Sequence, residues 1–319
     1  MAMPLTFSAP PAGLIIDLVT PLTTAGTLDG PGLDRLLARV LPFSDGLLAG
    51  SPLAGEGLEL SPKIREELLS HLLAAVAGQV PLFFGITGDG PEETKALAAW
   101  TREEIRRRDY QSPFFLADLP LWHHSNRGLP QYYRSLLAET ELPFLLLNLP
   151  REVRRRGRMF KHLNIRTQVF KKVADLPGVL GLIYQGEMRR FLHYHHAAAT
   201  RPGFAFYETD EVRFLTRPGA WGAVSGTAQI LPRVWQGVAR ACLHPEETAD
   251  DPARRYALWD QGNRLQQVSQ FCGPRPANLW KQALARQGII SSPALASGTS
   301  DIKPGDLEKF FELLAGFAE

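Results

Sequence analysis

Short apolar runs alternate with amphipathic stretches along most of this chain. The runs are rich in Val, Ile, Leu and Phe, which is typical of strands that are buried on both faces. They predict strands at residues 13–21, 46–50, 80–85, 113–118, 143–148, 179–183, 204–207 and 222–225. After the early strands, apolar residues recur at helical spacing, notably over residues 29–41, 61–77, 91–107 and 128–139. The pattern therefore predicts eight successive strand–helix units.

Eight alternations are what a closed parallel barrel requires. An open doubly wound sheet is the competing architecture, but no Gly-x-Gly-x-x-Gly sequence follows the first strand. We therefore expect an α/β fold, a (β/α)8 TIM barrel over residues 12–243. Residues 244–319 should form a C-terminal helical extension that packs on the barrel as one structural unit.

Three helical patterns are expected in this extension, at about residues 245–271, 278–287 and 304–317. The first carries apolar side chains that either build an oligomer contact or cover their own barrel: Leu258, Trp259, Leu265 and Val268. The sequence leaves both readings open.

Composition narrows the class of protein. At 319 residues and 45% hydrophobic the chain can bury one large core, and a formal charge of +2 is too balanced for an obligate nucleic-acid binder. Cys242 and Cys272 lie far apart without a CxxC spacing, so neither a zinc site nor a disulfide framework is expected, and a reducing cytoplasm fits best. No long apolar run suggests a membrane span. We expect no cofactor, no metal, no nucleic acid and no membrane partner.

Several short motifs occur in a characteristic order, from Thr20-Pro21 through Gly55-Glu56, Asn148-x-Pro150 and Gly181 to residues 219–225. With them the chain resembles the dihydrodipicolinate synthase / N-acetylneuraminate lyase family, class I aldolase TIM barrels, over nearly its whole length. The resemblance implies a barrel enzyme that acts on keto acids and assembles into dimers or tetramers.

The chain departs from that family at the position of its reactive lysine. In the family the sixth strand ends in Gly-hydrophobic-Lys, and the lysine forms a Schiff base with pyruvate or another 2-keto acid. Here Gly181-Leu182 match, but Ile183 falls at the lysine position and cannot form an imine. A shift by one residue offers Tyr184, and the nearest lysines, Lys171 and Lys172, lie on the preceding outer helix.

Three further departures point the same way. Residues 52–56 replace a Gly-Thr-Thr-Gly-Glu loop that holds the keto-acid carboxylate in the family, and Leu147 replaces a tyrosine that relays protons. Glu152 replaces an arginine that grips a second carboxylate in many synthases. We expect a degenerate site whose centre is plugged by aliphatic side chains: Leu53, Leu147 and Ile183.

Polar residues remain at the expected loops. Charge runs such as residues 151–158 are more often solvent-facing than ligand-binding, although these arginines could attract an anion. His123 and His124 are neighbours in an expected loop, where adjacent side chains point apart and do not easily share a metal ion. The candidate ligand-binding residues are Glu56, Asn148, Tyr184, Gln185, His123 and Arg151.

Three functions remain open. The first is a dihydrodipicolinate synthase-like protein, unable to do Schiff-base aldol or lyase chemistry, that acts as a small-molecule-binding or regulatory and assembly homologue. The alternative is a lyase or aldolase-type enzyme with an altered mechanism and an anionic keto-acid or sugar-phosphate substrate. The third is an ordinary keto-acid lyase, against which the missing lysine counts. We expect a small-molecule ligand, with anionic compounds among the candidates, and a cytoplasmic homo-oligomer.

Overall fold

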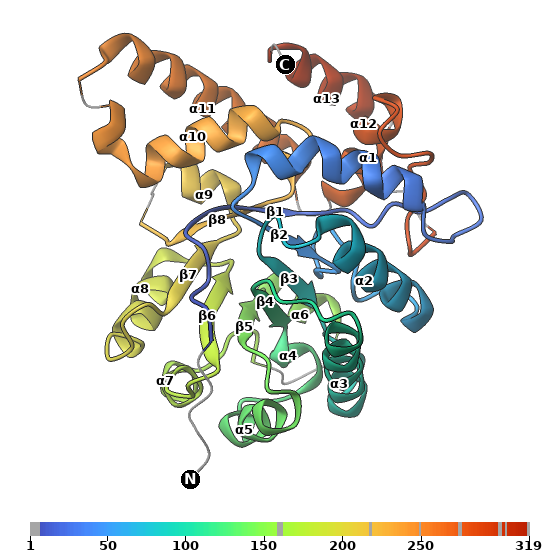
Figure 1. Cartoon of the computed structure of the whole chain (residues 1–319). Coiled ribbons are helices and arrows are strands. Elements are labelled where there is room, and N and C mark those ends of the chain that lie inside the picture. Colours follow the sequence, from blue (N-terminus) through green and yellow to red (C-terminus); the bar gives the residue numbers. More distant parts are fainter. Residues whose placement is uncertain are drawn as a thin grey trace.

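The computed structural model is a closed barrel of eight parallel strands in sequence order, surrounded by helices (Figure 1). It describes residues 7–157, 162–216, 219–248, 250–273, 276–298, 302–303 and 305–317. Each strand pairs with its neighbour in the sequence, and β1 closes the barrel on β8. The predicted TIM barrel is therefore confirmed. Its strands are β1 (Gly13–Asp17), β2 (Gly46–Ala49), β3 (Leu82–Gly85), β4 (Phe114–Asp118), β5 (Phe144–Asn148), β6 (Val179–Tyr184), β7 (Ala205–Glu208) and β8 (Gly222–Ser225).

The surrounding helices begin at residues suited to helix starts. Asp29 accepts a hydrogen bond from the Gly32 amide at 2.9 Å, and the Ser61 hydroxyl oxygen accepts one from the Ile64 amide at 3.3 Å. The helices of the barrel are α1 (Gly30–Val40), α2 (Pro62–Val76), α3 (Pro91–Arg107), α4 (Pro120–His123), α5 (Leu129–Thr140), α6 (Pro150–Arg155), α7 (Thr167–Ala174), α8 (Met188–Ala197), α9 (Glu211–Thr216) and α10 (Pro232–Leu243).

Hydrocarbon and aromatic side chains fill the barrel interior. Leu147, Ile183 and Tyr207 are register partners on β5, β6 and β7, so their side chains share one face. The Tyr207 ring meets Phe83 of β3 edge-on, with ring centroids 6.1 Å apart, which identifies that face as the interior. Ile183 is 1% exposed. The position is therefore a packed part of the core.

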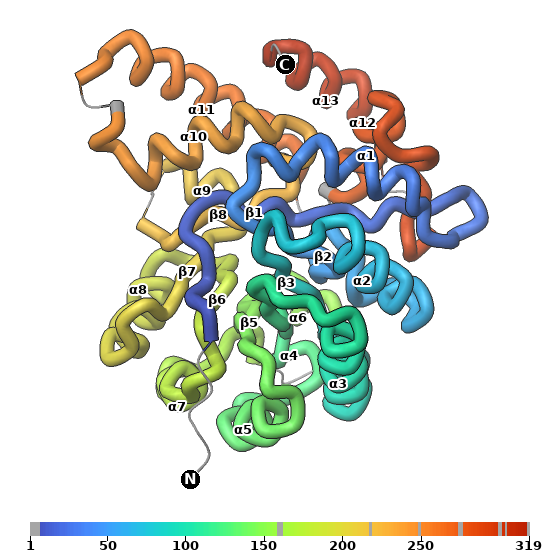
Figure 2. Tube along the Cα trace, in the orientation of Figure 1, coloured from blue at the N-terminus to red at the C-terminus, as the bar shows by residue number. Residues whose placement is uncertain are grey.

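The C-terminal helices are α11 (Pro252–Cys272), α12 (Pro276–Arg286) and α13 (Asp306–Ala315). In both the ribbon and the tube view α11 runs beside α10, and the red α13 lies near α12 (Figure 2). The single helix predicted from residue 245 is wrong, because a short 3-10 turn (Pro245–Thr248) precedes α11, which starts where Asp251 caps it. Leu265 and Val268 are buried against their own chain, whereas Trp259 is 66% exposed.

Two contacts tie the segment after α12 to the first helix. Arg35 Nε donates to the Ile289 carbonyl at 2.8 Å, and the Ser291 amide donates to Asp29 Oδ2 at 2.8 Å. The proposed division between residues 243 and 244 stays a prediction. Among the described helices, none is long and apolar enough to cross a membrane.

Packing of the interior at Ile183 can be measured. We expect Ile183→Ala to lower the free energy of unfolding by about 2–4 kcal/mol, because it leaves a void in a filled core. Leu192→Ala on α8, where the side chain is 58% exposed, should change it by less than about 0.5 kcal/mol. Urea denaturation of both variants checks this, and equal effects would mean that residue 183 is not packed.

Candidate functional site

A cavity of 410 Å³ opens at the carboxyl ends of the strands, where barrel enzymes hold their ligands. We call it the mouth cavity. Its walls come from the ends of β1, β6, β7 and β8, from the starts of α6 and α9, from the end of α11, and from α12. The charged and amide side chains that line it are Asp17, Arg151, Glu152, Gln185, Asp210, Glu211 and Gln270.

Asp17 is the last residue of β1 and faces inward. It is in register with Leu48, which is itself in register with the interior residue Phe83. The carboxylate is 2% exposed, and its Oδ2 accepts hydrogen bonds from Ser51 Oγ at 2.8 Å and from the Ala54 amide at 3.3 Å. Its Oδ1 is buried and has no hydrogen-bond partner among the described residues.

Burial raises the pKa of Asp17 to about 7. The hydrogen bonds from Ser51 and Ala54 oppose this shift, while the nearby charge of Glu211 adds to it. Asp17 therefore exchanges its proton near neutral pH.

Glu211 begins α9 and is held by donors from three elements. Its Oε1 accepts from Ser225 Oγ at 2.6 Å and from the Thr227 amide at 3.0 Å. Its Oε2 accepts from Thr227 Oγ1 at 2.7 Å and from Ser269 Oγ of α11 at 2.5 Å. This network fixes a carboxylate at the cavity wall and joins α11 to the barrel mouth.

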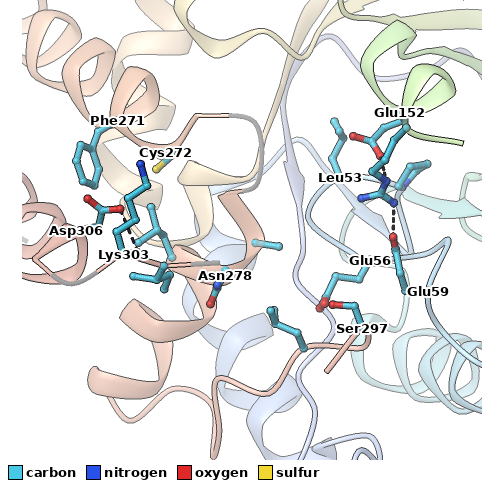
Figure 3. A pocket seen from close by; sticks show the side chains of 16 residues that line it. Leu53, Glu56, Glu59, Glu152, Phe271, Cys272, Asn278, Ser297, Lys303 and Asp306 are labelled. Carbon is cyan, nitrogen blue, oxygen red and sulfur yellow. Dashed lines mark hydrogen bonds and ion pairs between the residues drawn. The ribbon is translucent and has the colours of Figure 1, made fainter. Parts of the chain in front are cut away.

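A second, larger cavity of 740 Å³ lies beside the first and is shown in Figure 3. We call it the outer cavity. Glu56, Glu59 and Glu152 lie on one wall, and Phe271, Cys272, Lys303 and Asp306 lie on the opposite wall (Figure 3). Leu53, Glu152 and Cys272 line both cavities and so form the partition between them.

Glu56 connects the outer cavity to a buried lysine of α12. Its Oε1 accepts from the Ala296 amide at 2.9 Å, and its Oε2 forms an ion pair with Lys281 Nζ. Lys281 is fully buried and also donates to the Ala294 carbonyl at 2.8 Å. Burial lowers the pKa of Lys281, while the charge and hydrogen bond of Glu56 oppose that shift.

A model of the dihydrodipicolinate synthetase family matches residues 10–249 of this chain. The chain belongs to this family. It is 28% identical over 285 residues to the 4-hydroxy-tetrahydrodipicolinate synthase of Azoarcus sp. strain BH72, covering 87% of this chain and 89% of the relative. The corresponding protein of Limosilactobacillus fermentum is 29% identical over 286 residues, covering 88% and 84%.

Solved structures of the dihydrodipicolinate synthetase family share the fold. The dihydrodipicolinate synthase of Bacteroides thetaiotaomicron superposes with a TM-score of 0.79 at 22% identity, covering 98% of this chain and all (100%) of that chain. YagE, a prophage protein of the family from E. coli K12 solved in complex with pyruvate, gives a TM-score of 0.78 at 19% identity, covering 96% and 98%.

The six residues that we selected from the sequence are divided among several places in this family fold. Gln185 and Arg151 line the mouth cavity, and Glu56 lines the outer cavity. Tyr184 faces outward, where its ring packs on Phe191 of α8 and its hydroxyl donates to the Glu187 carbonyl at 2.9 Å. The ligand contacts predicted for the six selected residues stay predictions.

Asn148 and His123 belong to buried networks outside both cavities. The Asn148 side chain donates to Asn164 Oδ1 at 2.9 Å and accepts from the Ile165 amide at 3.0 Å. His123, in α4 and not in a loop, bonds through Nε2 to Asp118 Oδ1 at 3.1 Å. Burial raises the pKa of Asp118, but the charge and hydrogen bond of His123, together with hydrogen bonds from Tyr133 and Thr87, outweigh it and hold that pKa below its usual range.

Two residues that we did not select from the sequence hold central places. Asp17 lies within an apolar run, and an acidic residue inside a buried strand is a signal that could have drawn attention to it. Lys281 gave no such signal, because a lysine in an amphipathic helix is ordinarily exposed.

The ion pair between Glu56 and Lys281 should stabilise the fold strongly. We expect Lys281→Met to lower the free energy of unfolding by about 3–5 kcal/mol, because it leaves a buried carboxylate without its partner. Adding Glu56→Gln should restore part of the loss. Lys63→Met, which removes an exposed pair with Glu67, should cost less than about 1 kcal/mol in urea denaturation. Similar losses for Lys63→Met and Lys281→Met would contradict a buried pair.

The raised pKa of Asp17 gives stability a defined pH dependence. Between its unfolded value of 3.8 and its folded value of about 7, the folded chain binds more protons at this residue than the unfolded chain. Stability therefore falls as pH rises through this window. Relative to Asp17→Asn, wild type should lose about 2 kcal/mol of unfolding free energy between about pH 5 and about pH 7. Urea titrations at several pH values measure this, and a constant difference would refute it.

Proposed function

We propose that this family member does not form an imine with a keto acid. It instead binds a small molecule in the mouth cavity and acts as a binding, regulatory or assembly homologue. The main support is Ile183, an inward-facing hydrocarbon at the end of β6, packed between its register partners Leu147 and Tyr207. A side chain without an amine cannot form the covalent intermediate.

The surroundings of Asp17 also support a function other than keto-acid binding. Asp17 accepts hydrogen bonds from the Ala54 amide and the Ser51 hydroxyl of the loop that follows β2, so these donors are already engaged. A substrate carboxylate would have to compete with this internal carboxyl group for the same donors and would be repelled by its charge whenever Asp17 is ionised. Among the described residues, no lysine lines the mouth cavity.

An alternative is an enzyme of altered mechanism that uses the outer cavity. Lys303 lines this cavity, and the buried amine of Lys281 is paired with Glu56 in its wall. Lowered lysine pKa values favour nucleophilic amines. The ion pair and the carbonyl contact of Lys281 leave it poorly placed to attack a substrate, so we favour the first function.

Trapping with pyruvate and sodium borohydride tests the proposal. We expect no increase in the intact mass of the full-length chain beyond that of a control without pyruvate. A covalent increase would overturn the proposal, and peptide mapping would identify the lysine. Loss of that increase in Lys281→Met, with the fold intact by circular dichroism, would establish the alternative at the outer cavity.

A further inference from the structure

The mouth cavity presents two buried acceptors that lack donors. Asp17 Oδ1 and Gln185 Oε1 have no hydrogen-bond partner among the described residues, and both side chains line the cavity. Buried polar atoms in native proteins are nearly always satisfied. A group inside the cavity that donates at least two hydrogen bonds would meet this need.

The charges around the cavity favour a cation. Four carboxylates line it, at Asp17, Glu152, Asp210 and Glu211, whereas Arg151 is the one cation among the described lining residues. Two of the carboxylates have basic neighbours: Arg155 lies 3.3 Å from Glu152, and Arg213 lies 3.9 Å from Asp210. Asp17 and Glu211 form no ion pair among the described residues. The charge of Glu211, and that of Asp17 when it is ionised, therefore acts on whatever enters.

Part of the remaining wall is apolar and suits a short hydrocarbon chain, while Thr209, Ser269 and Gln270 add polar groups. Leu53, Val224 and Trp280 line the cavity, and its volume of 410 Å³ falls within the range of small-molecule sites. An ammonium group carries three donors and no acceptor, whereas a carboxylate offers acceptors alone. The first complements the two vacant oxygens, and the second would be repelled by them.

We infer that the mouth cavity binds a small aliphatic amine in its ammonium form, which donates to Asp17 Oδ1 and Gln185 Oε1. This inference rests on the proposed function, because it names the ligand of the same site. Binding is non-covalent and transfers no group.

Three probes of equal carbon number separate charge from shape. In isothermal titration calorimetry of the full chain, 1,5-diaminopentane should bind at least about tenfold more tightly than pentane-1,5-diol, since charged hydrogen bonds are the stronger kind. Glutarate should bind more weakly than the diol. Equal affinity for diamine and diol, or tighter binding of glutarate, would overturn the inference.

Matched variants locate the binding. Asp17→Asn, nearly identical in shape, should weaken diamine binding by about tenfold or more, and Gln185→Met by about threefold or more, because each loses one acceptor. Asp306→Asn, which removes a carboxylate from the outer cavity, should leave the affinity unchanged. Loss of affinity in Asp306→Asn alone would place the ligand elsewhere and refute the site. If Asp17→Asn does not fold, Gln185→Met decides.

The two proposals fail separately. Borohydride trapping of pyruvate would refute the proposed function whatever the diamine does. Absence of trapping together with absence of diamine binding would refute the amine site and leave the non-covalent function standing.

Discussion

The burial of the Asp17 carboxylate among the donors of the β2 loop shapes the whole barrel mouth. A carboxylate taken from water is costly unless hydrogen bonds replace its solvation. Ser51 and Ala54 supply two such bonds on one oxygen, and the other oxygen is buried without a hydrogen-bond partner among the described residues. Fixing one side of the group therefore orients the loop and also sets the charge that an incoming molecule meets.

The fold was predictable because its signals are local. Strands of a parallel barrel are buried on both faces, so they appear as continuous apolar runs, and residues such as Asp29 and Ser61 mark the helix starts. The location of Ile183 at the end of the sixth strand could also be predicted, because the apolar run that predicts this strand ends there. The exact start of α11 did not, because a proline-bounded turn at residues 245–248 resembles the beginning of a helix.

The site was less predictable because its contacts join distant parts of the chain. Side chains alternate along a strand, so an inward Ile183 requires an outward Tyr184, and the same alternation carries Asn148 outward beside it. Recognising that Tyr184 and Asn148 point outward required the strand register, which the family resemblance alone does not supply. Lys281 forms an ion pair with Glu56, and Glu211 accepts a hydrogen bond from Ser269. In both cases the partner lies far away in the sequence, so the local sequence does not reveal the contact.

These long-range contacts also explain how the C-terminal helices take part in the site. Ser269 of α11 bonds to Glu211 at the mouth cavity, and Lys281 of α12 pairs with Glu56 at the outer cavity. Each helix is thus held to the barrel by a carboxylate at a cavity wall. A molecule that alters the charge around these carboxylates acts on the contacts that hold the helices. In the function that we propose, the hydrocarbon-filled interior and the carboxylates at the mouth would serve recognition of a ligand, and these contacts would carry its effect to the helices.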